Sequence, residues 1–299
     1  MCSHRLRSVQ RACLVRCSLE VSWLISWSGD TERADTCPDK TARLYSWCRD
    51  KMQCLAVGGC ACLLFIEMNS KIGVIVQARM GSRRLPGKVL RLLAGKPVLQ
   101  YVLESLGQCE TVERVVVATS RAERDDPIAR FCERRGAACF RGALDDVAGR
   151  LLQAAGEAGF EALVRVSADS PLLDWRLVDR AVGLYAGGDY DLVTNVFPRS
   201  WPKGQSVEVL RAAVLRQGYS KTKGRSDREH VTRYFYDHPE RFQIKNFASG
   251  QDWGSLNLCV DTEEDWQKIE KIIHRMDRPH WEYTAAKLVG MLAPQLAQV

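Results

Sequence analysis

Residues 71–88 read KIGVIVQARMGSRRLPGK, and this stretch decides the fold. Its first half is an apolar, largely β-branched run from Ile72 to Val76, which predicts a strand buried on both faces. Its second half changes to glycines, a serine and cations, with Pro86 and Gly87 as a turn signal. A flexible cationic loop with exposed N–H groups at the end of a buried strand is suited to an anion such as a polyphosphate.

Two familiar phosphate-binding motifs do not fit this loop. A Walker A loop has four residues between its first glycine and Gly-Lys, followed by Ser or Thr. Here five residues separate Gly81 from Gly87, and Val89 follows Lys88. The GxGxxG fingerprint of dinucleotide-binding folds is also absent. The sequence therefore argues against a P-loop NTPase, and a solvated basic loop without a ligand is the alternative.

The sequence that follows alternates strand and helix patterns. Apolar runs predict strands at residues 114–119, 138–140, 162–166 and 191–196, and amphipathic stretches predict helices at 96–108, 125–135, 144–157 and 174–186. This alternation predicts an α/β fold with a mostly parallel sheet and helices on both faces. Ligands of such sheets bind outside the carboxyl ends of the strands, where both the cationic loop and Asp169 fall.

The second half of the chain is more mixed, and it places a second aspartate after a predicted strand. We expect strands at residues 207–210, 242–247 and 256–260, and helices at 211–218, 227–236, 262–274 and 282–292. Asp169 and Asp261 would each follow the carboxyl end of a strand, where two carboxylates can share Mg²⁺. The alternative is that each only caps the turn or helix that follows it.

The composition of the chain argues against some classes of binding partner. The chain has 299 residues, of which 46% are hydrophobic and 26% charged, and this composition is ordinary for a globular protein. The net charge of +7 comes without a long Lys/Arg run or a basic stripe with interleaved aromatics, so we expect no nucleic acid as a partner. Residues 55–66 are too short a run to cross a membrane, so we expect no membrane partner either. Four cysteines without ligand spacing follow residue 67, which suits a reducing cytoplasm.

Residues 1–67 differ from the rest. They hold eight of the twelve cysteines, and their apolar residues keep neither helical nor strand spacing for long. We interpret them as an extension, upstream of a natural start at Met68 or else a poorly ordered tail, and we expect one folded domain over residues 68–299.

Six segments in order resemble the sugar-activating cytidylyltransferases: VIVQARMGSRRLPGKVL, VVVATS, FRGALDDV, VRVSADSPLLD, SDREHVT and CVDTEED. The nearest branch is the spore-coat-polysaccharide-like one, which is related to acylneuraminate and 3-deoxy-manno-octulosonate cytidylyltransferases. The resemblance covers residues 71–274 and is most specific in the first segment. It implies a nucleotide-diphospho-sugar-transferase-like fold, so that residues 68–299 would form one nucleotidyltransferase domain. It also implies transfer of CMP from CTP to an acidic sugar with release of pyrophosphate, and leaves a homodimer open.

The resemblance also implies roles for particular residues. Arg79 and Lys88 match the triphosphate-binding Arg and Lys, and Asp169 and Asp261 match the two Mg²⁺ ligands, so these four are the expected catalytic residues. The sugar would contact Glu208, Glu229 and His230, although a histidine in an aromatic-rich helix is more often structural. The nucleotide would contact Ala78, Arg79, Gly81, Ser82, Arg83, Lys88, Ser120 and Asp169.

Two positions depart from the family pattern. Ala168 stands where the family has Gly, which is tolerated if its φ is negative. Ser206 stands where the spore-coat branch has Asp, which removes a carboxylate near the expected sugar site. This second departure keeps two alternatives open: a catalytically silent nucleotide-binding homologue, and a nucleotidyltransferase that uses another nucleotide.

Overall fold

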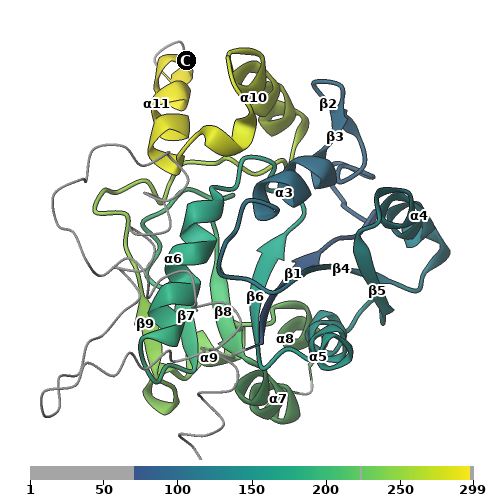
Figure 1. Ribbon diagram of the computed structural model, residues 1–299, viewed down its shortest axis with the longest axis vertical. Helices are drawn as coiled ribbons and strands as arrows, with labels where there is room; N and C mark the ends of the chain where they lie inside the picture. Colours follow the sequence, from purple (N-terminus) through teal and green to yellow (C-terminus); the bar gives the residue numbers. More distant parts are fainter. Residues whose placement is uncertain (1–70, 223, 297–299) are drawn as a thin grey trace, which may run out of the picture. The chain divides into compact units, whose positions relative to one another are not determined.

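A seven-stranded sheet organises the computed structural model, which describes residues 71–222 and 224–296 (Figure 1). The expectation for residues 1–67 lies outside these described residues. The strand order is β5-β4-β1-β6-β8-β7-β9. The strands are β1 (Ile72–Gln77), β4 (Val115–Ser120), β5 (Ala138–Gly142), β6 (Ala162–Ser167), β7 (Leu192–Thr194), β8 (Glu208–Arg211) and β9 (Ile244–Asn246).

The first predicted strand, β1, lies at the centre of the parallel part of the sheet. It pairs in parallel with β4, where Val74 lies opposite Val115, and with β6, where Ile72 lies opposite Ala162. β8 pairs antiparallel with both β6 and β7, and the other six strands share one direction. The predicted α/β fold with a mostly parallel sheet is therefore confirmed.

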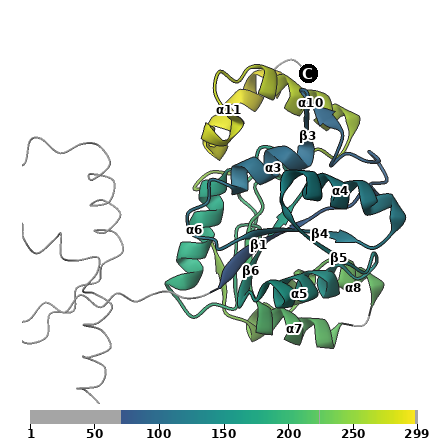
Figure 2. The same ribbon diagram turned by 45° about the vertical axis from the view of Figure 1, so that its right-hand side comes forward.

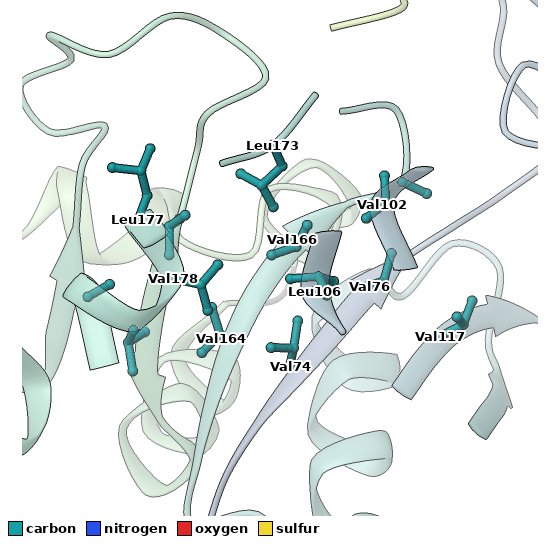
Figure 3. Packing of buried hydrophobic residues seen from close by; sticks show 14 of the residues in the cluster. Val74, Val76, Val102, Leu106, Val117, Val164, Val166, Leu173, Leu177 and Val178 are labelled. Carbon is teal, nitrogen blue, oxygen red and sulfur yellow. The ribbon is translucent and has the colours of Figure 1, made fainter. Parts of the chain in front are cut away.

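Helices cover both faces of this sheet, as predicted (Figures 1 and 2). One face carries α3 (Val98–Leu106), α4 (Asp126–Arg135) and α6 (Trp175–Ala186), and the other carries α5 (Val147–Ala158) and α7 (Ala212–Lys221). Successive side chains of β1 point to opposite faces of the sheet. Val74 and Val76 therefore pack against α3, α4 and α6, whereas Ile75 packs against α5 and α7. Figure 3 shows the first cluster, with Val102 and Leu106 of α3 packed over the strands.

One glycine in β1 is required by this packing. A Cβ built on Gly73 would lie 1.9 Å from Cζ of Phe160, so no side chain fits between the strand and that ring.

A third apolar cluster joins the end of the chain to the sheet layers. α10 (Glu263–His274) and α11 (Ala285–Leu296) meet there and pack against Val98 and Tyr101 of α3. α10 begins at a capping box in which Thr262 and Asp265 exchange hydrogen bonds. No helix in residues 71–222 and 224–296 has both the length and the apolar character that crossing a membrane requires.

The expected strand at residues 256–260 is wrong. This segment makes only an isolated bridge, between Asn257 and Lys203, because Leu258 and Val260 point into the third cluster beside α10 rather than into the sheet. The 96–108 helix begins later than predicted, since residues 96–97 form the second strand of a hairpin, β2 (Leu92–Leu93) and β3 (Lys96–Pro97).

The expected helix at residues 227–236 is two short helices, α8 (Arg225–Glu229) and α9 (Arg233–Asp237), with a break between them. At the break, Val231 and Thr232 are buried while His230 stays exposed. Three short 3₁₀ turns complete the described chain: η2 (Glu123–Asp125), η3 (Pro239–Arg241) and η4 (His280–Glu282).

Candidate active site

A cleft of about 640 Å³ lies at the carboxyl ends of the parallel strands. Its walls come from the residues that follow β1, β4, β5 and β6. This is where ligands of open α/β sheets bind, because the strand ends leave a crevice there. Of the residues expected at a site, the lining includes Ala78, Arg79, Gly81, Ser82, Arg83, Lys88, Asp169, Glu229, His230 and Asp261.

Lys88 joins the two aspartates in this cleft. Its ammonium nitrogen lies 2.7 Å from Oδ2 of Asp169 and 2.7 Å from Oδ1 of Asp261. The second carboxylate oxygen of Asp261 lies 3.0 Å from Nη2 of Arg84. The Lys88 side chain is 9% exposed, whereas the side chains of Asp169 and Asp261 are 21% and 31% exposed, so the ammonium is the best shielded part of this charge cluster. The two carboxylates therefore converge, as their sequence positions led us to expect.

The cluster shifts the pKa values of Lys88 and Asp261. Burial lowers the pKa of the Lys88 ammonium, but the charges and hydrogen bonds of Asp169 and Asp261 outweigh it, so the pKa is raised. Burial likewise raises the pKa of Asp261, but Lys88 and Arg84 outweigh it, so that pKa is lowered. Lys88 is thus held charged and Asp261 ionised.

Asp261 reaches the cleft without a preceding strand. The N–H of Val260 donates to the carbonyl oxygen of Asp169 at 2.9 Å, which places the two aspartates side by side. On the other side, Asp265 accepts from the backbone N–H groups of Asp261 and Thr262. We expected two strand ends to bring Asp169 and Asp261 together. Instead, the hydrogen bond from Val260 to Asp169 and the cap of α10 at Asp265 hold the two aspartates side by side.

Buried contacts hold the cationic loop in shape. The N–H of Met80 donates to Oδ1 of Asp125 at 2.7 Å, and Gly87 N–H donates to the Met80 carbonyl at 2.9 Å. Gly87 has a φ of +71°, a conformation that glycine adopts without strain. The Ser82 hydroxyl accepts from Leu85 N–H inside the loop.

Ser120 does not line the cleft, although we expected it to contact the nucleotide. It is fully buried, and its hydroxyl donates to Asp125, the same carboxylate that holds Met80. Ser120 therefore supports the loop from behind.

Arg79 and Glu229 face each other across the cleft. Nη2 of Arg79 lies 3.0 Å from Oε1 of Glu229, and both side chains are close to half exposed. The pair connects the loop after β1 with the end of α8, and His230 follows on the same wall.

Two cleft arginines were missed by our sequence reasoning. Arg150 of α5 is 2% exposed, and its Nη1 donates to the carbonyl oxygen of Ala143 at 2.6 Å while its buried Nε has no partner. Burial lowers the pKa of its guanidinium. Arg124 lies over the loop, because a Cβ on Gly81 would be 3.3 Å from its Cζ. Arg150 lies in the FRGALDDVAGR stretch, where an arginine amid apolar helix positions was the available signal.

Glu208 is not part of the cleft wall, although we expected it to bind the substrate. Its carboxylate is buried in the sheet, where it pairs with Arg165 and accepts from the Tyr236 hydroxyl. Arg165 also donates to Oε1 of Gln77 at 3.0 Å, and Gln77 does line the cleft. Glu208 thus reaches the cleft only through two other side chains.

The two departures from the family pattern have structural explanations. Ala168 is buried in the first core cluster, and Ala94 is the only non-glycine residue with positive φ in residues 71–222 and 224–296, so the Ala168 methyl is unstrained. The Ser206 hydroxyl accepts from Nη1 of Arg199 at 3.1 Å.

The donor set of the cleft fits a hard divalent cation that a polyphosphate helps to coordinate. Two converging carboxylates supply oxygen ligands, and Mg²⁺ commonly takes one or two carboxylates plus phosphate oxygens. Within the described ranges, no group of three His, Cys, Asp or Glu side chains gathers to hold a metal by itself. A cation here would depend on the ligand's own oxygens.

The sequence profile of the family described as cytidylyltransferase matches residues 73–283. The spore coat polysaccharide biosynthesis protein SpsF of Bacillus subtilis is 30% identical over 229 residues, which cover 73% of this chain and 92% of that protein. An uncharacterised protein of Methanocaldococcus jannaschii, MJ1063, is 33% identical over 199 residues, which cover 66% of this chain and 81% of its own.

Solved structures share the fold. A cytidylyltransferase from Leptospira borgpetersenii superimposes with a TM-score of 0.72 at 29% identity, covering 76% of this chain and 95% of that one. A CMP:2-keto-3-deoxy-manno-octonic acid synthetase complexed with CTP has a TM-score of 0.54 at 19% identity over 69% of this chain and 99% of that one, which supports the fold alone.

Proposed function

The chain belongs to the cytidylyltransferase family and is a nucleotidyltransferase, and from this premise we propose that it transfers CMP from CTP to an acidic sugar and releases pyrophosphate. The observation that carries the proposal is the contact of Lys88 with both Asp169 and Asp261 inside a cleft lined by arginines. CTP carries about four negative charges, and such a cleft offsets them.

The proposed reaction is an in-line displacement at the α-phosphorus. A sugar hydroxyl oxygen forms the new bond to the α-phosphorus while its proton is released to solvent, and the bond from that phosphorus to the oxygen it shares with the β-phosphate breaks, so that pyrophosphate leaves. Arg79 and Lys88 would bind the β- and γ-phosphates and stabilise the charge that develops on the departing pyrophosphate. The loop contacts of Met80 and Gly87 keep these cations in place before CTP arrives, which reduces the cost of orienting them.

Asp169 and Asp261 are the residues that would hold Mg²⁺. When bound, the metal would neutralise phosphate charge and lower the pKa of the attacking hydroxyl. Lys88 contacts one oxygen of each carboxylate, and the phosphates of CTP would offer its ammonium an alternative partner. His230 lines the same cleft and is the candidate for contact with the sugar, together with Glu229.

The acidic sugar is proposed from the relatives. A 3-deoxy-manno-octulosonate cytidylyltransferase of Geobacter sulfurreducens is 37% identical over 113 residues, which cover 44% of that protein. The spore coat relative points to polysaccharide synthesis as the destination of the product. We propose a cytoplasmic reaction, since the cysteines of the described chain are free thiols. A homodimer stays a prediction.

Two other functions remain as alternatives. The first is a nucleotidyltransferase that uses another nucleotide. The second is a silent nucleotide-binding homologue, which Ser206 keeps open because it replaces a carboxylate of the spore-coat branch.

One experiment separates these readings. Pyrophosphate release is measured with each of the four ribonucleoside triphosphates, in Mg²⁺, across a panel of acidic sugars that includes 3-deoxy-manno-octulosonate and N-acetylneuraminate. Release that requires CTP and one sugar supports the proposal. Release with a different nucleotide supports the first alternative, and nucleotide binding without release under all combinations supports the second.

A further inference from the structure

Asp146 gathers three donors from three different parts of the fold. Its Oδ1 accepts from Gly149 N–H at 2.9 Å and so caps α5. Its Oδ2 accepts from the Tyr219 hydroxyl of α7 at 2.6 Å and from Nη1 of Arg228 of α8 at 3.2 Å. The hydrogen bond to Asp146 raises the pKa of the Tyr219 hydroxyl, which keeps it a donor.

Arg228 and Tyr219 also bind each other. Nη1 of Arg228 donates to the Tyr219 oxygen at 2.9 Å, and the guanidinium carbon lies 4.6 Å from the centre of the Tyr219 ring. The three side chains therefore form a closed triangle, which we call the clasp. Each member has two partners inside it, so removing any one leaves the other two with an incomplete set.

The clasp lies directly behind the cleft wall. Leu144, Asp145 and Val147 line the cleft on either side of Asp146, and Glu229 and His230 line it immediately after Arg228. α8 has only five residues, so it cannot hold its position by helix propensity. On its other side the chain is anchored by the buried Val231 and Thr232. The clasp is the matching anchor before Glu229.

We propose that Asp146 is a positioning residue, which acts through Arg228 and Tyr219 to set Glu229 and His230 against the cleft. This inference rests on the proposed function only for its effect on turnover. It also explains why the FRGALDDV and SDREHVT segments occur in one chain, since the second aspartate of the first segment binds the arginine of the second.

The test uses hydrogen exchange and kinetics on the full chain. Asp146→Asn keeps an oxygen for capping α5 but loses the charge that binds Arg228, whereas Arg228→Gln and Tyr219→Phe open the other two corners. Arg233→Gln is the matched control, because Arg233 begins the following helix, α9, and forms an exposed pair with Asp237 outside the clasp. We expect amide protection over residues 226–232 to fall about tenfold in the three clasp variants and not in the control.

Measurements of turnover distinguish a positioning role of the clasp from a role in the stability of the fold alone. With the acceptor identified by the sugar panel, kcat should fall about tenfold or more, while the KM for CTP changes less than about twofold, because the contacts of Lys88 with Asp169 and Asp261 do not involve the clasp. Asp146→Asn combined with Arg228→Gln should lose no more than either alone.

Unchanged exchange over residues 226–232 in the clasp variants would overturn the inference, and so would faster exchange with normal kcat. If the wild-type chain releases no pyrophosphate with any sugar, the proposed function fails, and the exchange measurement still decides whether the clasp holds the segment.

Discussion

The ammonium nitrogen of Lys88 lies 2.7 Å from a carboxylate oxygen of Asp169, although 81 positions separate the two residues in the sequence. The same nitrogen contacts Asp261 at 2.7 Å. A divalent cation at the proposed metal site would be held by the same two carboxylates, so Lys88 and the cation would compete for their negative charge. A triphosphate that draws Lys88 away would thus favour cation binding, and the coupling must be reciprocal.

Replacing Lys88 by Met should tighten Mn²⁺ binding in the absence of nucleotide, because the competing ammonium is gone. The signal of free Mn²⁺ in electron paramagnetic resonance measures this affinity directly. Turnover should fall about 10²–10³-fold, since a cation on the leaving pyrophosphate is lost. Lys96→Met is the control, because Lys96 pairs with Glu104 away from the cleft. Weaker Mn²⁺ binding in Lys88→Met would show that Lys88 only holds the carboxylates together.

Asp169→Asn and Asp261→Asn should each abolish Mg²⁺-dependent turnover while the chain stays folded. The amide keeps the shape of the side chain but loses the charge that a divalent cation requires. Pyrophosphate release and circular dichroism measure the two effects. Asp189→Asn serves as the control, because Asp189 is 93% exposed and pairs with Arg211 outside the cleft. An Asn variant with normal turnover in Mg²⁺ would refute the proposed metal site.

Arg150→Met should weaken CTP binding about tenfold or more. Losing a hydrogen bond from a buried charged donor costs about 1.5–3 kcal/mol, and the Arg150 guanidinium lines the cleft with a free Nε. Calorimetric titration with CTP gives the affinity, and thermal unfolding reports any loss of stability from its contact with Ala143. Arg134→Met on the exposed face of α4 should leave CTP affinity unchanged. Equal affinities in both variants would remove Arg150 from the site.

The contacts of Asp261 should make stability depend on pH in a defined direction. Its pKa is lowered below 3.8, so its contribution is fully present above that value and is lost as the pH falls through the lowered pKa. Lys88 has a raised pKa, so its contribution is lost only as the pH rises above 10.5 and through the raised value. The difference in Tm between wild type and Asp261→Asn should be constant from about pH 5 to pH 9 and shrink in acid. A difference that grows as the pH falls would contradict this assignment.

A chain that begins at Met68 should fold and keep full activity. Within the part of the chain that the structure describes, the sheet and the three apolar clusters are built from residues 72–292, which such a shortened chain retains. Thermal unfolding and pyrophosphate release of this shortened chain, compared with the full chain, test the prediction. Lower solubility or turnover would mean that residues 1–67 have a role in the folded protein.

The sequence pattern predicted strand positions well for the strands that are buried on both faces of the sheet. β1, β4 and β6 lie in the centre of the parallel sheet and were predicted within one residue at each end, because their apolar runs, rich in β-branched residues, favour a strand that is buried on both faces. The apolar run at residues 256–260 satisfied the same criterion but packs against α10, since a short apolar segment can be buried by helices as well as by a sheet.

The sequence by itself determined the α/β fold, the cationic loop and the two aspartates, because those depend on local composition and on the order of elements along the chain. Only the tertiary structure decided which side chains share the cleft. In the folded chain, Ser120 and Glu208 make buried contacts instead of lining the cleft, and Arg150 lines it. Asp261 is placed there by a backbone hydrogen bond and not by a strand. Such outcomes depend on contacts between residues far apart in sequence, and no local pattern records which partner a buried polar group finds.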